Sequence, residues 1–296
     1  MGRTASTNTD TDSSGWGRVR LITILTAGLL AALAFAVGLG FAAHYALRST
    51  GQAEPANGPI GQNAGSLAPL VTVDPADKVA AALGQAHRDQ LAAAPMLAAT
   101  PEDSRQGTPA ATPGPFVQVP PATRTGPAQV PTGFTHTPAG AVGQLAAIEA
   151  TVLQGMSIPQ TNQVHQQWTL PGATNIEHWP LTGNVQAFLA TARQGQTKDP
   201  TVSVTTVPVA GQVKGTDGPD WVLACVLLDV RAVIKTDSRM AYGYCERMQW
   251  ASGADGGRWM IAPGSSPATA PSTWPGTDLA IAAGWRTWTG PGEGTD

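Results

Sequence analysis

One long apolar stretch limits what this chain can be. Residues 21–47 read LITILTAGLLAALAFAVGLGFAAHYAL and contain no Lys, Arg, Asp or Glu. A helix of this length rises about 40 Å, whereas the hydrocarbon core of a bilayer is about 30 Å thick, so it spans the membrane with some tilt. No later run in the sequence is comparable. We therefore predict a single-pass membrane protein with one transmembrane helix over residues 21–47.

Basic residues indicate the direction in which this helix crosses the membrane. Arg3, Arg18 and Arg20 precede the apolar run, whereas Arg48 alone follows it closely. Because basic flanks stay in the cytoplasm, residues 1–20 are predicted to be a cytoplasmic stub, with the rest of the chain extracellular. A cleaved signal peptide is the alternative, but its apolar region usually has only about 7–15 residues. The predicted location is the cell membrane.

Residues 48–130 are rich in Ala, Pro and Gly, as in ATPGPFVQVPPATRTGPAQV. Such a composition buries too little apolar surface to offset the entropy lost on ordering. It predicts a low-complexity tether that lets the outer part of the chain extend away from the membrane. One Ala-rich interruption follows Asp74 and begins with Pro75, which predicts a short helix near residues 75–93. This helix either stands alone and frays or docks on a partner.

A folded domain is predicted over residues 131–296, which contain eight of the nine Trp and both Cys. Thr137 followed by Pro is typical of a helix start. Apolar residues then recur at three- and four-residue spacing, at Ala141, Leu145, Ile148, Val152 and Met156. A short second helix is expected near residues 160–168, and Thr182 is expected to cap a third. We consider Leu145, Ile148 and Val152 a candidate interaction face.

Strand patterns follow the helices. Alternating or β-branched runs separated by Gly- and Asp-containing turns occupy residues 201–213, 221–234, 239–251 and 258–262. Short turns between such runs predict an antiparallel meander. Helices first and strands second indicate an α+β domain, in which a curved antiparallel sheet packs one face on the helices. A last short helix is expected near residues 278–285.

Cys225 and Cys245 lie on consecutive predicted strands. If the hairpin is centred on Lys235, the two cysteines are equidistant from it and face one another across the strands. Cβ atoms of such cross-strand pairs are about 4.5–5.5 Å apart, which is close enough for a disulfide. An extracellular location favours the bond. Two buried free thiols are the alternative, and a zinc site is not expected because no paired His accompanies them.

Candidate pocket residues are His165, Trp168, His178, Trp179 and Asp229. The two His flank a Trp-containing loop, and a His–Asp pair inside a cone-shaped pocket is able to act as a general base. Surface or hydrogen-bonded His and core Trp are the simpler interpretation. The sequence shows no G-x-S-x-G motif and no phosphate-binding glycine pattern after a strand. We therefore predict no enzyme activity, no cofactor and no metal.

The charge of the chain bears on its partners. The net charge is -3, and no dense cluster of Lys and Arg occurs. Direct binding to nucleic acid is therefore not expected. The expected partners are the membrane and other protein subunits or further copies of the chain.

Four sequence stretches carry a resemblance to known proteins. VPTGFTHTPAGAVGQLAAIEATVL at residues 130–153, and GPDWVLACVLLDV, YGYCERMQW and GRWMIAPG within residues 218–264, resemble single-pass membrane proteins of unknown function in high-GC Gram-positive bacteria. The order of stub, span, tether and outer domain resembles the VirB/TcpC-type assembly proteins of conjugative type IV secretion machines. This resemblance implies a nuclear-transport-factor-like fold without catalytic residues, which associates with itself and with other channel subunits.

Two functions from different classes follow. The first is a non-catalytic scaffold or assembly component, in the resemblance a part of a conjugative or type IV secretion apparatus. The second is a tethered extracellular ligand-binding module. A scaffold should expose a large apolar patch or a symmetric dimer face. A binding module should contain an apolar pocket with a few converging polar groups.

Overall fold

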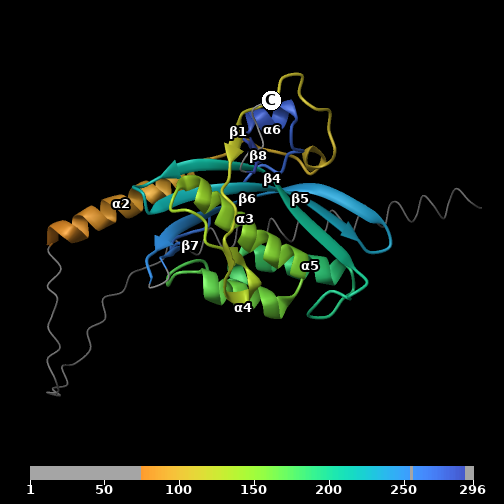
Figure 1. The fold of residues 1–296 in the computed structure, drawn as a ribbon, viewed down its shortest axis with the longest axis horizontal. Helices are drawn as coiled ribbons and strands as arrows, with labels where there is room; N and C mark the ends of the chain where they lie inside the picture. The colour runs from red at the N-terminus through yellow and green to blue at the C-terminus, as the bar shows by residue number, and fades with distance from the viewer. Residues whose placement is uncertain (1–74, 254–255, 291–296) are drawn as a thin grey trace, which may run out of the picture. The chain divides into compact units, whose positions relative to one another are not determined.

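A computed structural model describes residues 75–253 and 256–290 (Figure 1). The predicted stub at residues 1–20, the predicted transmembrane helix at 21–47 and the first part of the predicted tether at 48–74 lie outside the described residues. Within the described ranges, no helix is both long enough and apolar enough to cross a membrane.

The helices begin where local signals place them. The longer ones are α2 (Pro75–Ala93), α3 (Pro138–Gly155), α4 (Ile158–Trp168) and α5 (Pro180–Thr191), and a short α6 spans Asp278–Ala282. Helix α3 starts because the Thr137 hydroxyl oxygen accepts a hydrogen bond from Gly140 N at 3.1 Å. It ends at Met156, whose backbone is left-handed with φ of 40°.

The chain has an α+β fold built on a six-stranded mixed sheet. The strands are β1 (Phe116–Gln118), β4 (Ser203–Thr216), β5 (Trp221–Val233), β6 (Asp237–Ala251), β7 (Arg258–Ile261) and β8 (Arg286–Thr289), in the order β1-β8-β4-β5-β6-β7. Strands β4 to β7 form the predicted antiparallel meander. The prediction of a purely antiparallel sheet is wrong, because β1 pairs with β8 in parallel. A separate pair joins β2 (Arg124–Thr125) to β3 (Pro131–Thr132).

Helices α3, α4 and α5 lie together on one face of the sheet, here called the helix face (Figure 1). The main core forms there, and Leu145, Ile148 and Val152 of α3 are buried in it. They pack with side chains of the sheet that include Val222, Ala224, Val226 and Leu228. The three residues proposed as an interaction face are therefore internal. These side chains pack against the domain's own sheet, so they are not available to contact a partner.

The opposite face of the sheet, here called the back face, is covered by segments from both ends of the described chain. Asp89 of α2 forms an ion pair with Arg247 of β6 at 2.7 Å. Ala268 N donates to Ala92 O at 2.8 Å, and the Lys214 ammonium donates to the carbonyl oxygens of Ala92 and Ala94. From the C-terminal half of α2 onward, the chain up to residue 130 thus packs on the domain. The predicted tether was expected to extend to residue 130. The segment packs instead because its hydrogen bonds and ion pair to the sheet stabilise a chain whose Ala-rich composition buries little apolar surface.

Candidate functional site

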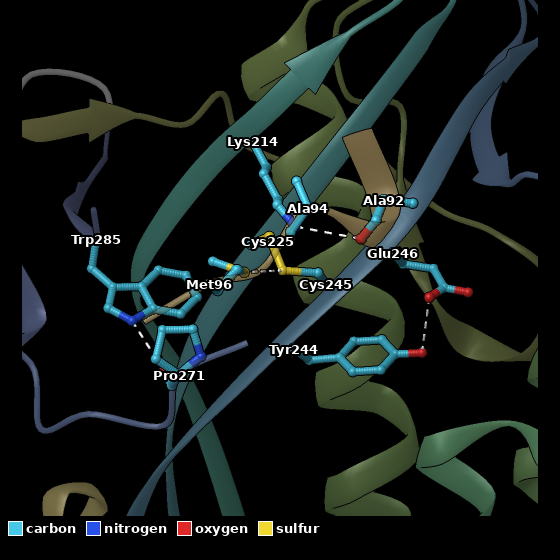
Figure 2. The surroundings of a disulfide bond; sticks show 10 residues. All are labelled: Ala92, Ala94, Met96, Lys214, Cys225, Tyr244, Cys245, Glu246, Pro271 and Trp285. Carbon is cyan, nitrogen blue, oxygen red and sulfur yellow. Dashed lines mark hydrogen bonds between the residues drawn. A yellow bond between two sulfur atoms is a disulfide. The ribbon is translucent and has the colours of Figure 1, made fainter. Parts of the chain in front are cut away.

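The two cysteines form a disulfide on the back face (Figure 2). Cys225 and Cys245 are exact partners in the β5–β6 register, with Cα atoms 4.0 Å apart. The Cys245 sulfur lies 3.5 Å from the sulfur of Met96, and Trp285 closes the same cluster by donating to Pro271 O at 3.1 Å. The predicted pairing is confirmed. The bond joins two strands under a covering layer, and its role is structural.

A cavity of about 430 Å³ opens on the helix face. Helices α3 and α5 form one side of it, and strands β4, β5 and β6 form the other. Its walls are mainly apolar and include Leu153, Met156, Phe188, Val204, Val230 and Met240. Among the described residues that line it, none is Lys, Arg, His, Asp or Glu. The lining therefore suits an apolar, uncharged molecule.

Two polar side chains meet at this cavity. The Asn184 side-chain amide of α5 donates a hydrogen bond to the Tyr242 phenol oxygen of β6 at 2.7 Å. Burial raises the pKa of the Tyr242 phenol, and the charge of Glu149 raises it further. The phenol therefore keeps its proton at neutral pH. It remains a hydrogen-bond donor beside an amide that has both donor and acceptor atoms.

Two carboxyl groups, Glu149 and Glu246, are buried and near enough to Tyr242 to raise the pKa of its phenol. Glu149 of α3 is fully buried, and neither of its carboxyl oxygens has a hydrogen-bond partner among the described residues. Glu246 of β6 is also buried and accepts a hydrogen bond from the Tyr244 phenol at 3.2 Å (Figure 2). Burial raises the pKa of Glu246 to about 8. Burial, and after it the nearby Glu246 charge, raises the pKa of Glu149 well above its ordinary value, so burial favours the protonated form of both groups.

The residues predicted to form a pocket are only partly brought together. The His165 and Trp179 rings touch edge to face with centroids 5.2 Å apart, and His165 Nε2 is bonded to Thr174 O at 2.8 Å. Trp168 is buried and donates to Pro127 O at 3.1 Å, whereas His178 is exposed. These side chains serve packing and loop attachment.

Asp229, the fifth predicted pocket residue, lies apart from this group. It forms an ion pair with Arg239 across the β5–β6 hairpin, with Arg239 Nε at 2.9 Å from the carboxylate. The proposed His–Asp dyad is therefore not assembled from the predicted residues. A different pair, His136 and Asp220, lies 2.7 Å apart at the surface, where the His136 ring stacks on Trp250.

The polar residues at and behind the cavity were missed from the sequence, although two patterns point to them. Glu149 interrupts the apolar stripe of α3 at a position four residues after Leu145, so it shares the buried helix face. Glu246 follows Tyr242 and Tyr244 at two-residue spacing, which places all three on one face of the strand. Each pattern marks a buried acid, but neither shows that the two acids meet.

Comparison with protein-family models, with curated proteins and with solved structures finds no match for this chain. In the described part of the chain, no group of three or more His, Cys, Asp or Glu is placed to hold a metal ion. The functional interpretation therefore rests on the geometry of the cavity and its polar end.

Proposed function

We propose that this chain is a non-catalytic ligand-binding module, anchored in the cell membrane through residues 21–47 with its domain outside the cell. The observation that carries the proposal is the cavity of about 430 Å³ on the helix face. It combines apolar walls with a small polar end at Asn184 and Tyr242, which is the usual design of a small-molecule site. A nuclear-transport-factor-like arrangement, with helices closing over one face of a curved sheet, belongs to this proposal.

The proposal is tested by blocking the cavity. The full-length chain is placed in lipid nanodiscs and titrated with Nile red, a neutral dye that fluoresces in apolar sites, and the signal of empty nanodiscs is subtracted. Ala187 lines the cavity, whereas Ala190, one turn further along α5, is exposed and does not line it. We expect Ala187→Trp to abolish saturable binding and Ala190→Trp to leave it intact. Equal binding by both variants and the wild type would contradict the proposal.

A second candidate function is the assembly component suggested by the resemblance to conjugative secretion proteins. One observation favours it. The C-terminal half of α2 is tied to the domain, while Val79 and Leu83 in its N-terminal half are 60% and 67% exposed. Uncovered apolar side chains on a helix whose other half is tied to the domain suit contact with another subunit.

This second function is tested by a photocrosslinking residue at position 83 in the native host, with exposed position 186 of α5 as the control site. Specific adducts with secretion subunits or with further copies of the chain, obtained from position 83 alone, would support assembly. Identical adduct patterns from both positions would count against it.

A further inference from the structure

The cavity on the helix face follows β5 and β6 toward the hairpin that joins them. Much of its floor consists of alternate residues, which share one face of each strand and cover about 13 Å along it. These floor residues are Val230, Ala232 and Ile234 of β5 and Ser238, Met240 and Tyr242 of β6. Ile234 and Met240, near the hairpin, are 44% and 43% exposed, whereas Tyr242 at the far end is half-buried. The cavity therefore has an open, mainly apolar end and a more enclosed end that is polar.

Asn184 and Tyr242 keep unused hydrogen-bonding capacity at the enclosed end. Both residues line the cavity, and the Asn184 side-chain amide donates to the Tyr242 phenol oxygen at 2.7 Å. The phenol still has its own hydrogen to donate, and the side-chain carbonyl oxygen of Asn184 is able to accept. No described residue accepts from this phenol or donates to this carbonyl oxygen. The pair therefore offers a ligand one donor and one acceptor, side by side.

The lining also limits the charge of the ligand. Among the described residues that form it, none carries a charge that would balance an ionised ligand group. Moving an ionised group out of water without a counter-charge is unfavourable. Burial raises the pKa of the Tyr242 phenol, which therefore stays neutral and keeps its hydrogen. A neutral group with an acceptor and a donor on neighbouring atoms fits the pair best. An amide is such a group, whereas an ester lacks the donor.

We propose that the cavity binds neutral molecules in which an apolar body is joined to an amide group. The amide carbonyl oxygen accepts a hydrogen bond from the Tyr242 phenol, and the amide N–H donates to the side-chain carbonyl oxygen of Asn184. The apolar body lies along the floor toward the hairpin. This inference rests on the proposed function, because it names the ligand class of the same cavity. Small amides and peptide backbones share this chemistry.

The test uses a matched pair of probes, N-methyl-4-phenylbutanamide and methyl 4-phenylbutanoate, in which an ester oxygen replaces the amide N–H. The probes 4-phenylbutyrate and 4-phenylbutylamine add a negative and a positive charge to the same apolar body. Each competes with Nile red for the full-length chain in nanodiscs at pH 7, with correction for partition into empty nanodiscs. We expect the amide to bind about fivefold more tightly than the ester, because the ester leaves the Asn184 carbonyl oxygen without a donor. Both charged probes should bind about tenfold more weakly than the amide.

Variants locate the two hydrogen bonds. Asn184→Leu removes the acceptor for the amide N–H, so the amide and the ester should bind within about twofold of each other. Tyr242→Phe removes the donor to the carbonyl oxygen that both probes share, so both should weaken by about fivefold. This variant is the second test if Asn184→Leu folds poorly. Gln186→Leu, a similar change at an exposed residue of α5 outside the cavity lining, is the matched control and should leave both affinities unchanged.

A capped dipeptide, N-acetyl-leucyl-phenylalaninamide, distinguishes the two sources of the amide. Binding tighter than that of the small amide, and weakened by Asn184→Leu, would assign the cavity to a peptide. Weaker binding would assign it to small amides.

The outcomes separate the inference from the proposed function. Binding of the ester as tight as that of the amide, or tighter binding of either charged probe, would overturn the inference and leave the binding module standing. An amide preference that persists unchanged in Asn184→Leu would also overturn it. Failure of every probe to displace dye, together with no effect of Ala187→Trp, would remove the proposed function itself.

Discussion

The two faces of the sheet surround their buried ionisable groups in opposite ways. Glu246 and Arg247 are neighbours on β6, so their side chains point to opposite faces. Arg247 is 2% exposed on its side chain but fully engaged: it bonds to Asp89 at 2.7 Å and to Ser265 O at 2.9 Å. On the helix face, Glu246 accepts one hydrogen bond, from the Tyr244 phenol, whereas Glu149 has no hydrogen-bond partner among the described residues.

The difference lies in how completely each buried group is hydrogen-bonded. The back face even shapes its backbone around Arg247: Gly264 has φ of +120°, and a Cβ there would lie 2.5 Å from Arg247 Nη1. The ion pair, the hydrogen bond to Ser265 and the close approach of Gly264 enclose the Arg247 guanidinium and supply its partners. Around Glu149 the described residues leave hydrogen-bonding capacity unused, an arrangement that costs stability.

The largest expected effect is a fall in the free energy of unfolding as the pH rises, caused by the ionisation of Glu246. The folded-state pKa of Glu246 is raised to about 8 from an ordinary value of 4.5. A raised carboxyl pKa means that the folded state holds the proton longer than the unfolded state. Stability contributed by the protonated group is therefore present below pH 4.5 and is lost between about pH 4.5 and 8, at up to about 1.4 kcal/mol per pH unit.

Urea denaturation of the wild type and of Glu246→Gln at pH 5.0, 6.5 and 8.0 measures this loss. The variant should be the more stable of the two at pH 8 and should show the shallower decline. Parallel declines would mean that Glu246 is ionised in the folded state, and the contrast between the two faces would fail.

On the back face, Asp89→Ala should cost about 3–5 kcal/mol, because it leaves the Arg247 charge buried without its partner. Alanine is the best helix former, and the Gln85–Asp89 hydrogen bond lost within α2 is worth only about 0.2–0.5 kcal/mol, so most of the loss arises at Arg247. Denaturation monitored by Trp fluorescence gives the change in the free energy of unfolding. A cost below about 1 kcal/mol, the value typical of surface pairs, would show that Arg247 is satisfied without α2.

The disulfide should contribute about 3 kcal/mol, the value that the chain-entropy model gives for a loop of its size. The double variant Cys225→Ala/Cys245→Ala should lower the free energy of unfolding by this amount and leave ligand binding on the helix face intact. Thiol titration of the unreduced, denatured wild type should detect no free thiol. Two titratable thiols would sink the assignment.

Signals that lie within a few residues of one another were readable from the sequence. Thr137 caps α3 as its position before Pro138 predicts. The cysteine pairing follows from equal spacing on either side of the hairpin centre. Helix α5 shows the limit of this reasoning, because it begins at Pro180 and not after Thr182. Its N-cap, Trp179, makes no side-chain capping bond, so the start signal is the proline alone.

Contacts between distant parts of the chain were not readable. Asp89 and Arg247 are 158 residues apart, and nothing near either residue indicates the other. Without that anchor, residues 75–130 have the composition of a tether. The acid pair was hidden for the same reason: the patterns in α3 and β6 each place a glutamate on a buried face, but only the packing of that helix on that strand brings the two carboxyl groups together.

The smallest expected effect tests whether the stability of the back face depends on the burial of Arg247 or on ion pairing in general. Arg88 and Asp217 form a second ion pair between α2 and the sheet at 2.6 Å, with both side chains 29% exposed. Asp217→Ala should cost at most about 1 kcal/mol, because water replaces the lost partner. Arg88 also keeps its position over the Trp221 ring, at 5.6 Å from the ring centroid. If this variant were as unstable as Asp89→Ala, the two ion pairs would act as one network, and α2 would be held by its summed charge and not by the buried Arg247.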